Sequence, residues 1–457
     1  MIKELSDFTM AIKVLKFGGT SVADSTAMRK VFDIISSNRE DKQIVVLSAC
    51  AGITDKLLKL SETALSQDNE YLQILEEIEN HHLKLIVELF RDSEKSASCI
   101  KSVNFLLQSL KKLIEGVKIL EEITPKVKAE ILSYGELLST NIFYQYALSR
   151  GLNSFLLDSR EIIETDNYHL NAKPNFEKIQ QNGEKLKKLL QNYPIVITQG
   201  FIGNWKKETT ILGRGGSDLS ASLFGYSVNA DEILIWTDVD GIMTTDPRLV
   251  PNAKVIEKIT VDEVAELSFF GAKVLHPDTI KPALAKNIPV KVLNTFNPNG
   301  IGTTIYQNNG NTFEPKVSSM LLIEDCFYLR RQVTKDSRDF SYYLNLLKSN
   351  FEKLFKFSFN DNTILAIVKS PKGSDSFNLL EQEEFLNQKV DAIALFGLNI
   401  PNIDKEEKSK LDFITDRISE LLESKLFFVV SDYSAILLLQ PNKGKEVIEF
   451  VHSILFD

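Results

Sequence analysis

The chain has 457 residues, and its acidic side chains outnumber its basic ones, 62 to 53, which gives a net charge of −9. This negative surplus argues against a general binder of nucleic acid or of anionic membranes. The composition is that of a globular protein with several domains. No apolar run is long enough for a membrane span, and the N-terminus lacks the apolar core of a signal peptide. Three widely separated cysteines predict neither a disulfide framework nor a thiolate zinc site, so a cytoplasmic protein is expected.

The first 308 residues predict an alternation of strands and helices. Short apolar runs predict strands over 12–17, 43–49, 153–159, 193–201, 232–239 and 288–296. Helical spacing of apolar residues predicts helices over 26–38, 175–192, 218–229 and 261–271. The purely helical pattern of 61–122 also suits a coiled coil, but its interruption near 92–97 favours an inserted helical hairpin. This succession is typical of a parallel sheet covered by helices.

The stretch over 297–315 is rich in glycine and asparagine and is the strongest candidate for a domain boundary. Beyond it, a β–α–β–β–α rhythm occurs twice. The sequence therefore predicts one large α/β domain over 1–308, followed by two small α+β units over 316–457.

A first motif, KFGGTS over 16–21, lies where a strand ends and a helix is expected to start. Glycines there let the backbone approach an anion, the helix start offers free N–H groups, and Lys16 adds a positive charge. A strand that ends in a plain glycine turn with a solvated lysine explains this motif equally well when it is taken alone.

A second motif, GRGGSD over 213–218, precedes another expected helix. Arg214 can grip a carboxylate or a phosphate in a fork, and the glycines expose backbone donors. A flexible turn with Ser217 or Asp218 as the helix cap is the structural alternative. It accounts for the glycines but gives no reason for Arg214, so a binding role is favoured.

A third motif, TDVDG over 237–241, closes an expected strand, and TTDPR over 244–248 follows it. The carboxyl ends of parallel strands are where ligands bind. A pair of Asp-Gly and Asp-Pro turns is the alternative, so this motif is weak by itself.

Other chemistries have little support in the sequence. There is no GxxxxGK[ST] run and no GxGxxG fingerprint, which argues against P-loop and NAD enzymes. We expect the pair His81 and His82 to be solvated on a helix, and Cys50 to be a small half-buried residue and not a nucleophile. His276, before a proline, is interpreted as a packing or turn residue.

Taken together, seven segments in one order resemble the aspartate kinase family. They are LKFGGTSVAD (15–24), VVLSACAGIT (45–54), YGELLST (134–140), VITQGFIG (196–203), TTILGRGGSDLSA (209–221), IWTDVDGIMTTDPRLV (235–250) and FGAKVLHPDTI (270–280). They span nearly all of 12–306, which makes the resemblance highly specific. The length resembles the monofunctional, lysine-branch type, because too little chain remains for the homoserine dehydrogenase of fused members.

The resemblance implies an amino-acid-kinase fold, a carbamate-kinase-like three-layer αβα sandwich, followed by two ACT-type regulatory units. It implies transfer of the γ-phosphoryl of ATP, with Mg²⁺, to the side-chain carboxylate of L-aspartate. The product, 4-phospho-L-aspartate, leads to lysine, methionine and threonine. Such a transfer needs positioning and charge neutralisation, and the acceptor is already ionised, so no catalytic histidine is expected. A homodimer through the ACT-type units is also implied.

The resemblance assigns roles to individual residues, with no resident metal ligands among them. Lys16 would bridge the nucleotide phosphates, and Asp218 would orient groups and the magnesium shell near them. The implied aspartate-binding residues are the hydroxyls of Ser48 and Thr54, the acid Glu136 for the amino group, and Arg214 with Ser217 for the carboxylate. The implied ATP-binding residues are Lys16, Gly18, Gly19, Ser21, Thr237, Asp238, Met243, Arg248, Lys273 and Val274. Met243 stands where the family usually has tyrosine, and methionine can still pack on a base.

The C-terminal third departs from the family. The family's first ACT unit holds its inhibitor with a glycine-containing turn and a Ser-Val-Asp run. The corresponding stretch here, RRQVTKDSRDFSYYLNLLKSNFEKLFKF over 330–357, has neither. We therefore predict a weak or absent response to lysine, or a different effector. The alternative is a diverged loop that binds lysine through backbone groups.

Two other functions are open at this stage. One is an amino-acid or carbamate kinase of the same fold with a different acceptor, and the matches at Thr54, Glu136 and Arg214 speak against it. The other is a non-catalytic sensor built on an inactive kinase domain, which the retention of Lys16 and Asp218 disfavours.

Overall fold

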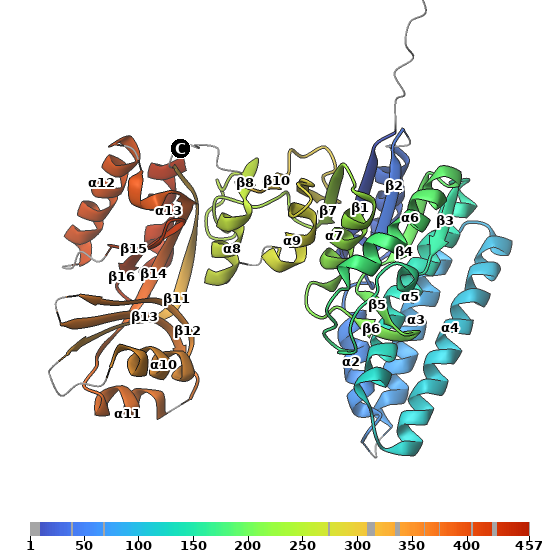
Figure 1. Ribbon diagram of the computed structural model, residues 1–457, viewed down its shortest axis with the longest axis horizontal. Helices are drawn as coiled ribbons and strands as arrows, with labels where there is room; N and C mark the ends of the chain where they lie inside the picture. Colours follow the sequence, from blue (N-terminus) through green and yellow to red (C-terminus); the bar gives the residue numbers. More distant parts are fainter. Residues whose placement is uncertain are drawn as a thin grey trace, which may run out of the picture. The chain divides into compact units, whose positions relative to one another are not determined.

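The computed structural model describes residues 10–37, 40–66, 69–272, 275–308, 316–333, 339–360, 362–373, 375–403, 405–422 and 427–456 (Figure 1). The chain divides into two compact units. The first comprises Met1–Ile242 with Leu275–Gln307, and the second comprises Met243–Val274 with Asn308–Asp457. The segment 243–274 precedes the glycine-rich stretch over 297–315 but groups with the C-terminal part of the chain.

The first unit is built on a sheet whose strands follow the order β3-β4-β2-β1-β7-β9-β10. Their bounds are β1 (Ile12–Phe17), β2 (Lys42–Leu47), β3 (Ser154–Leu157), β4 (Ile195–Gln199), β7 (Glu232–Thr237), β9 (Val290–Asn294) and β10 (Thr303–Tyr306). All pairings are parallel except that of β10 with β9. The six strands expected here are thus confirmed. The central strands are buried along most of their length, as a sheet covered on both faces requires.

Helices cover both faces of this sheet. Their bounds are η1 (Thr20–Val22), α1 (Ser25–Ser37), α2 (Ile53–Thr63), α3 (Glu70–Leu89), α4 (Ser93–Leu120), α5 (Pro125–Ser149), η2 (Ser159–Glu161), α6 (Phe176–Asn192), α7 (Gly216–Val228) and α9 (Pro277–Leu284). The expected helical hairpin is α3 and α4, which lie side by side in Figure 1. Asp92 begins α4, because its side chain accepts hydrogen bonds from the backbone N–H groups of Glu94 and Lys95.

Two elements of the first unit have no clear signal in the sequence. Helix α5 is buried on several sides, so its apolar residues do not follow a single face. The short hairpin of β5 (Ile202–Trp205) and β6 (Glu208–Ile211) mixes polar and apolar residues over four positions per strand. Helix α5 nevertheless carries Glu136 of the candidate site, and β6 carries Thr209 of the polar network described below.

The second unit contains β8 (Lys258–Thr260), α8 (Val261–Phe270) and an antiparallel sheet in the order β12-β13-β11-β14-β16-β15. The sheet strands are β11 (Lys316–Gln332), β12 (Phe351–Asn360), β13 (Thr363–Pro371), β14 (Leu386–Leu398), β15 (Phe427–Ser431) and β16 (Ser434–Leu439). The remaining elements are α10 (Phe340–Asn350), α11 (Asp375–Gln382), η3 (Ile400–Asn402), α12 (Lys405–Leu422) and α13 (Gly444–Phe456).

The double β–α–β–β–α rhythm is confirmed. One round is β11, α10, β12, β13 and α11, and the other is β14, α12, β15, β16 and α13. Each round has its own apolar core, one around Tyr343 and Leu347 and the other around Ile393 and Ile448. The predicted fold class, an α/β amino-acid-kinase layer structure followed by two α+β ACT-like units, is therefore correct. Among the described helices, none is both long and apolar enough to cross a membrane.

Candidate active site

The candidate site lies along one edge of the sheet in the first unit. Phe17 at the end of β1 pairs with Leu47 of β2 and Trp236 of β7, so these parallel strands end at the same level. Strand β4 ends beside β2, because Leu47 pairs with Gln199. The strand order also reverses between β1 and β7. A topological switch point of this kind opens a crevice at the carboxyl ends of the strands.

An ion pair marks this edge. Lys16, on β1, is only 8% exposed, and its Nζ lies 2.7 Å from Oδ1 of Asp218 in the first turn of α7. Beyond this ion pair, no hydrogen bond from a described residue reaches the buried Oδ1. The site thus combines a largely buried cation, a carboxylate and the positive end of a helix dipole.

The glycine turn after β1 is held close to its neighbours. The backbone N–H of Gly18 donates to the carbonyl of Trp236 at 3.1 Å. A Cβ atom on Gly19 would lie 3.0 Å from the carbonyl oxygen of Ala49, closer than ordinary packing allows. Ser21 continues the turn, and its buried hydroxyl lies 2.8 Å from that of Thr295. Only glycine lets this turn lie so near the loop after β2.

Glu136, on α5, faces the same edge. Its side chain is 3% exposed, and no hydrogen bond from a described residue reaches its Oε2. Burial raises the pKa of this carboxyl from its ordinary 4.5 to about 8, although a backbone hydrogen bond with Ala49 and the charge of Lys16 act to lower it. A buried carboxyl oxygen without a partner is costly in a core, so Oε2 of Glu136 is well suited to receive a positively charged ligand group.

The loop after β2 carries the two hydroxyl residues expected in the site. Ser48 directly follows the strand, and Thr54 lies in the first turn of α2. Ser139, on α5, donates a hydrogen bond to the carbonyl of Ser48 at 2.7 Å. This bond fixes the loop to the helix that carries Glu136. Ser139 therefore supports the site, although its only sequence signal is that it falls within the YGELLST run.

The glycine-rich loop before α7 lies against the turn after β4. A Cβ atom on Gly200 would lie 2.7 Å from the hydroxyl of Ser217. Gly213 and Gly215 have φ angles of 75° and 69°, a left-handed conformation that side chains rarely adopt. Arg214 between them is exposed and makes no ion pair with a described residue. Its guanidinium is therefore available for an anionic ligand.

The expected nucleotide residues are distributed over both units. Thr237 and Asp238 end β7, and the Thr237 hydroxyl donates to Asp238 Oδ1 at 3.1 Å. Met243 and Arg248 belong to the second unit, where the guanidinium of Arg248 forks onto the carboxylate of Asp246. Lys273 and Val274 lie outside the described residues. The first unit therefore brings together the residues around Lys16, and the rest of the nucleotide set stays a prediction.

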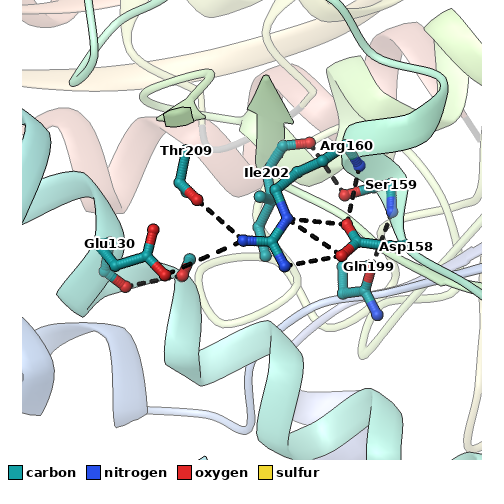
Figure 2. Close-up of polar contacts among 8 residues, drawn as sticks. Glu130, Asp158, Ser159, Arg160, Gln199, Ile202 and Thr209 are labelled. Atoms are coloured by element: carbon teal, nitrogen blue, oxygen red, sulfur yellow. Dashed lines mark hydrogen bonds and ion pairs between the residues drawn. The ribbon is translucent and has the colours of Figure 1, made fainter. Parts of the chain in front are cut away.

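Figure 2 shows a polar network that the sequence analysis missed. Arg160 forks onto Asp158 with Nη2–Oδ2 at 2.7 Å, donates to Thr209 Oγ1 at 2.9 Å, and lies 4.0 Å from Glu130 of α5. Gln199, at the end of β4, joins this network, because its side chain accepts a hydrogen bond from the backbone N–H of Ser159. The network fastens β3, β4 and the β5–β6 hairpin to α5. A clue was the Asp-x-Arg spacing in the loop after β3.

The structure also tests the other candidate residues. Cys50 is 1% exposed, so it is fully buried and not half-buried as expected, and burial raises the pKa of its thiol to about 12, which argues against a nucleophile. The expectation that His82 is solvated is wrong, because α3 turns this side chain inward and burial lowers its pKa to about 4. His276 is a turn residue, as expected, since its ring accepts a hydrogen bond from the N–H of Asp278.

The chemistry of the site fits magnesium that arrives with a nucleotide. Within the described ranges, no group of three or more His, Cys, Asp or Glu side chains could hold a metal ion. Mg²⁺ in nucleotide enzymes needs only one or two carboxylates, because phosphate oxygens and water complete its shell. The buried Oδ1 of Asp218 is a suitable carboxylate oxygen.

Comparison with known proteins agrees with this geometry. The model of the amino acid kinase family matches residues 11–294. Lysine-sensitive aspartokinase 3 of Escherichia coli is 37% identical over 306 residues, which are 66% of this chain and 65% of that protein, less than two thirds of the relative's length. A crystal structure of E. coli aspartokinase III in complex with lysine and aspartate has a TM-score of 0.79 at 30% identity, over 98% of this chain and all of the other. A structure of the same E. coli protein with aspartate and ADP has a TM-score of 0.74 at 28% identity, again over 98% and 100%. The chain belongs to the amino acid kinase family and, within it, to the aspartokinases.

Proposed function

We propose that this protein transfers the γ-phosphoryl group of MgATP to the side-chain carboxylate of L-aspartate, which gives 4-phospho-L-aspartate. The observation that carries this proposal is the largely buried Lys16–Asp218 ion pair at the strand edge, with the carboxyl of Glu136, whose Oε2 has no hydrogen-bond partner, facing the same edge. The E. coli relative, solved with aspartate and with ADP, supports the same choice of ligands.

The acceptor would be held by groups of opposite charge. The ammonium group of aspartate favours the ionised form of Glu136, so binding offsets the burial that otherwise keeps this carboxyl protonated. The exposed guanidinium of Arg214 can fork onto the α-carboxylate. Hydroxyls of Ser48, Thr54 and Ser217 would then orient the side-chain carboxylate, which attacks without any prior loss of a proton.

Phosphoryl transfer concentrates negative charge on the transferring group, and the chain supplies positive partners. Lys16 would leave its ion pair with Asp218 to bridge the phosphate oxygens, while the close glycine turn presents backbone N–H groups. Mg²⁺ bound with ATP would supply charge neutralisation of the phosphates, with Asp218 on its shell. Positioning and electrostatics thus account for the reaction without a strong general base.

A coupled assay of ADP release tests the proposal. L-aspartate, glutamate, acetate and carbamate are offered as acceptors with MgATP, and the Lys16→Ala variant serves as the inactive control. Aspartate alone should give Lys16-dependent turnover. Turnover only with another acceptor would identify a different kinase of this fold, and no turnover with any acceptor would favour a sensor.

Two further expectations go with this function. A homodimer through the ACT-like region would appear in light scattering as twice the mass of one chain. A cytoplasmic location is expected, because both proposed substrates are cytoplasmic metabolites, and cell fractionation would check it.

A further inference from the structure

The first unit also contains a polar cavity. Of the helices around it, only α5 also carries a residue of the strand edge described above. The cavity has a volume of about 220 Å³ and opens where α1, the α3–α4 turn and the end of α5 meet. No residue that lines it has a role in the proposed phosphoryl transfer. Its size is below that of a typical pocket for a drug-sized molecule, so it suits a small metabolite.

The lining of this cavity is strongly positive. Arg29, Arg91, Lys95 and Arg150 all line it. Within the described part of the chain, none of these four side chains lies within ion-pair distance of a carboxylate, although the whole protein carries a net charge of −9. Arg91, Lys95 and Arg150 are exposed, so water weakens their mutual repulsion, but together with Arg29 they form a concentrated positive patch that attracts an anion.

The one acidic side chain in the lining does not neutralise these cations. Asp92 uses its Oδ1 to accept hydrogen bonds from the backbone N–H groups of Glu94, at 2.9 Å, and Lys95, at 3.3 Å. It caps α4 in this way. Two of the cations also make fixed hydrogen bonds, since Arg29 donates to the carbonyl of Glu88 and Lys95 donates to that of Ser149. These two bonds hold Arg29 and Lys95 beside the opening.

A tyrosine adds a hydrogen-bond donor to the lining of this cavity. Tyr146 lines the cavity and is only 6% exposed, with its ring packed edge-on against Phe32 and Phe90. Its hydroxyl makes no hydrogen bond with any other described residue. The ring is buried but the hydroxyl is not sealed in the core, so it can donate a hydrogen bond to a ligand oxygen in the cavity.

We propose that this cavity binds a small multivalent anion, a metabolite with phosphate or carboxylate groups that is smaller than a nucleotide. The guanidinium groups of Arg29, Arg91 and Arg150 match the planar oxygens of such groups in a fork, and Tyr146 donates a further hydrogen bond. A bound anion would join α1, the start of α4 and the end of α5. This site is additional to the one proposed for aspartate and ATP.

Isothermal titration calorimetry at constant ionic strength tests the proposal, with inorganic phosphate, pyrophosphate and citrate as probes. The double variant Arg91→Gln/Arg150→Gln removes two charges from the cavity. The matched control Lys111→Gln/Lys112→Gln removes two exposed charges from α4, about 24 Å along this helix from Lys95 of the cavity. Wild type and control should bind at least one probe saturably, and the cavity variant should bind it at least about tenfold more weakly. Preference for phosphate or for citrate identifies the ligand class.

Three outcomes would overturn the proposal. One is no saturable binding of any probe, and another is equal weakening in the control variant, which would indicate a general charge effect. The third is binding that persists in the cavity variant but disappears in Lys16→Ala, which would place the anion at the strand edge. If the double variant does not fold, as judged by circular dichroism, Tyr146→Phe and Lys95→Gln decide in its place, and each should weaken binding several-fold.

Discussion

The strand edge of the first unit requires particular residues at particular positions, whereas the antiparallel sheet of the second unit requires only a pattern of apolar residues. The family model matches residues 11–294, whereas the likeness to E. coli aspartokinase III covers 98% of the chain. An antiparallel sheet with two cores needs alternating apolar residues, which many sequences supply. The strand edge needs a lysine, a glycine pair and buried acids at fixed points. The fold of the second unit therefore persists although the stretch over 330–357 lacks the motifs named above, and the residues proposed for catalysis, Lys16 and Asp218, lie in the first unit.

The largest expected effect tests whether Lys16 is the charged centre of the strand edge. Lys16→Ala should lower kcat by at least about 100-fold, because a preorganised cation acts on charge that develops during transfer. Steady-state kinetics with ADP release measures it. The control is Lys13→Ala on the same strand, whose side chain pairs with Asp41 at 2.9 Å near the other end of β1. Comparable losses in both variants would contradict a specific role for Lys16.

Substitution of Arg214 tests how the same strand edge binds the phosphoryl acceptor, aspartate. Arg214→Ala should raise the KM for aspartate by roughly tenfold or more, with a smaller change in kcat, because the α-carboxylate carries its charge throughout the reaction. Lys207→Ala, an exposed cation on the nearby hairpin, serves as the control. An unchanged KM for aspartate in Arg214→Ala would mean that this guanidinium does not hold the substrate.

Glu136 predicts a pH dependence of substrate binding. With a pKa of about 8, the carboxyl is mostly protonated at pH 7 and mostly ionised at pH 9 in the free protein. The ammonium group of aspartate binds the ionised form, so KM should fall roughly five- to tenfold between these pH values. Glu136→Gln should bind poorly and show no such dependence. A flat KM profile in the wild type would contradict this role.

The same carboxyl predicts a gain in stability when it is removed. Its pKa lies higher in the folded than in the unfolded state, so the folded protein binds the proton more tightly. Stability is therefore greatest below the unfolded pKa of 4.5 and declines as pH rises towards about 8. Glu136→Gln should raise Tm by a few degrees at pH 8.5 and hardly change it at pH 5, in thermal denaturation followed by circular dichroism. A lower Tm for Glu136→Gln than for the wild type at pH 8.5 would contradict the conclusion that burial destabilises the ionised form of Glu136.

The smallest expected effect concerns the second unit. Lysine should inhibit weakly or not at all, because a buried pocket must pair the charged groups of its ligand and the motifs that do so are missing over 330–357. Residues 334–338 of this stretch lie outside the described residues. The assay titrates lysine, with E. coli aspartokinase III as the positive control. Strong inhibition at submillimolar lysine would show that another arrangement has replaced those motifs.

Much of the fold could be predicted because its strands are continuous apolar runs with turn residues at their ends. β1 matches its expected range of 12–17, and β4 and β7 lie within their expected ranges of 193–201 and 232–239. α5 could not be predicted, because a helix buried on several sides has no single apolar face. The burial of His82 was missed for a related reason, since one residue's orientation on a helix depends on which neighbours pack against it.

The candidate site was only partly predictable from the sequence. Motifs locate Lys16 at a strand end and Arg214 in a glycine-rich loop, but they do not show that Oε2 of Glu136 lacks a hydrogen-bond partner or that Ser139 anchors the loop after β2. Such contacts join residues far apart in the chain. The Arg160 network in Figure 2 is of the same kind, because its partners come from β3, β4, β6 and α5.

The central position of β1 also affects how the protein is made. One edge of β1 pairs with β2, which is synthesised soon afterwards, but its other edge pairs with β7, and Ile12 bonds to Asp231 across 219 positions. During translation this second edge therefore stays open until more than half of the chain has emerged. Such distant pairing is slow, and an open apolar edge can pair with another chain. Newly made protein should therefore be most prone to aggregation before β7 leaves the ribosome, and chaperone binding in that interval should raise its yield.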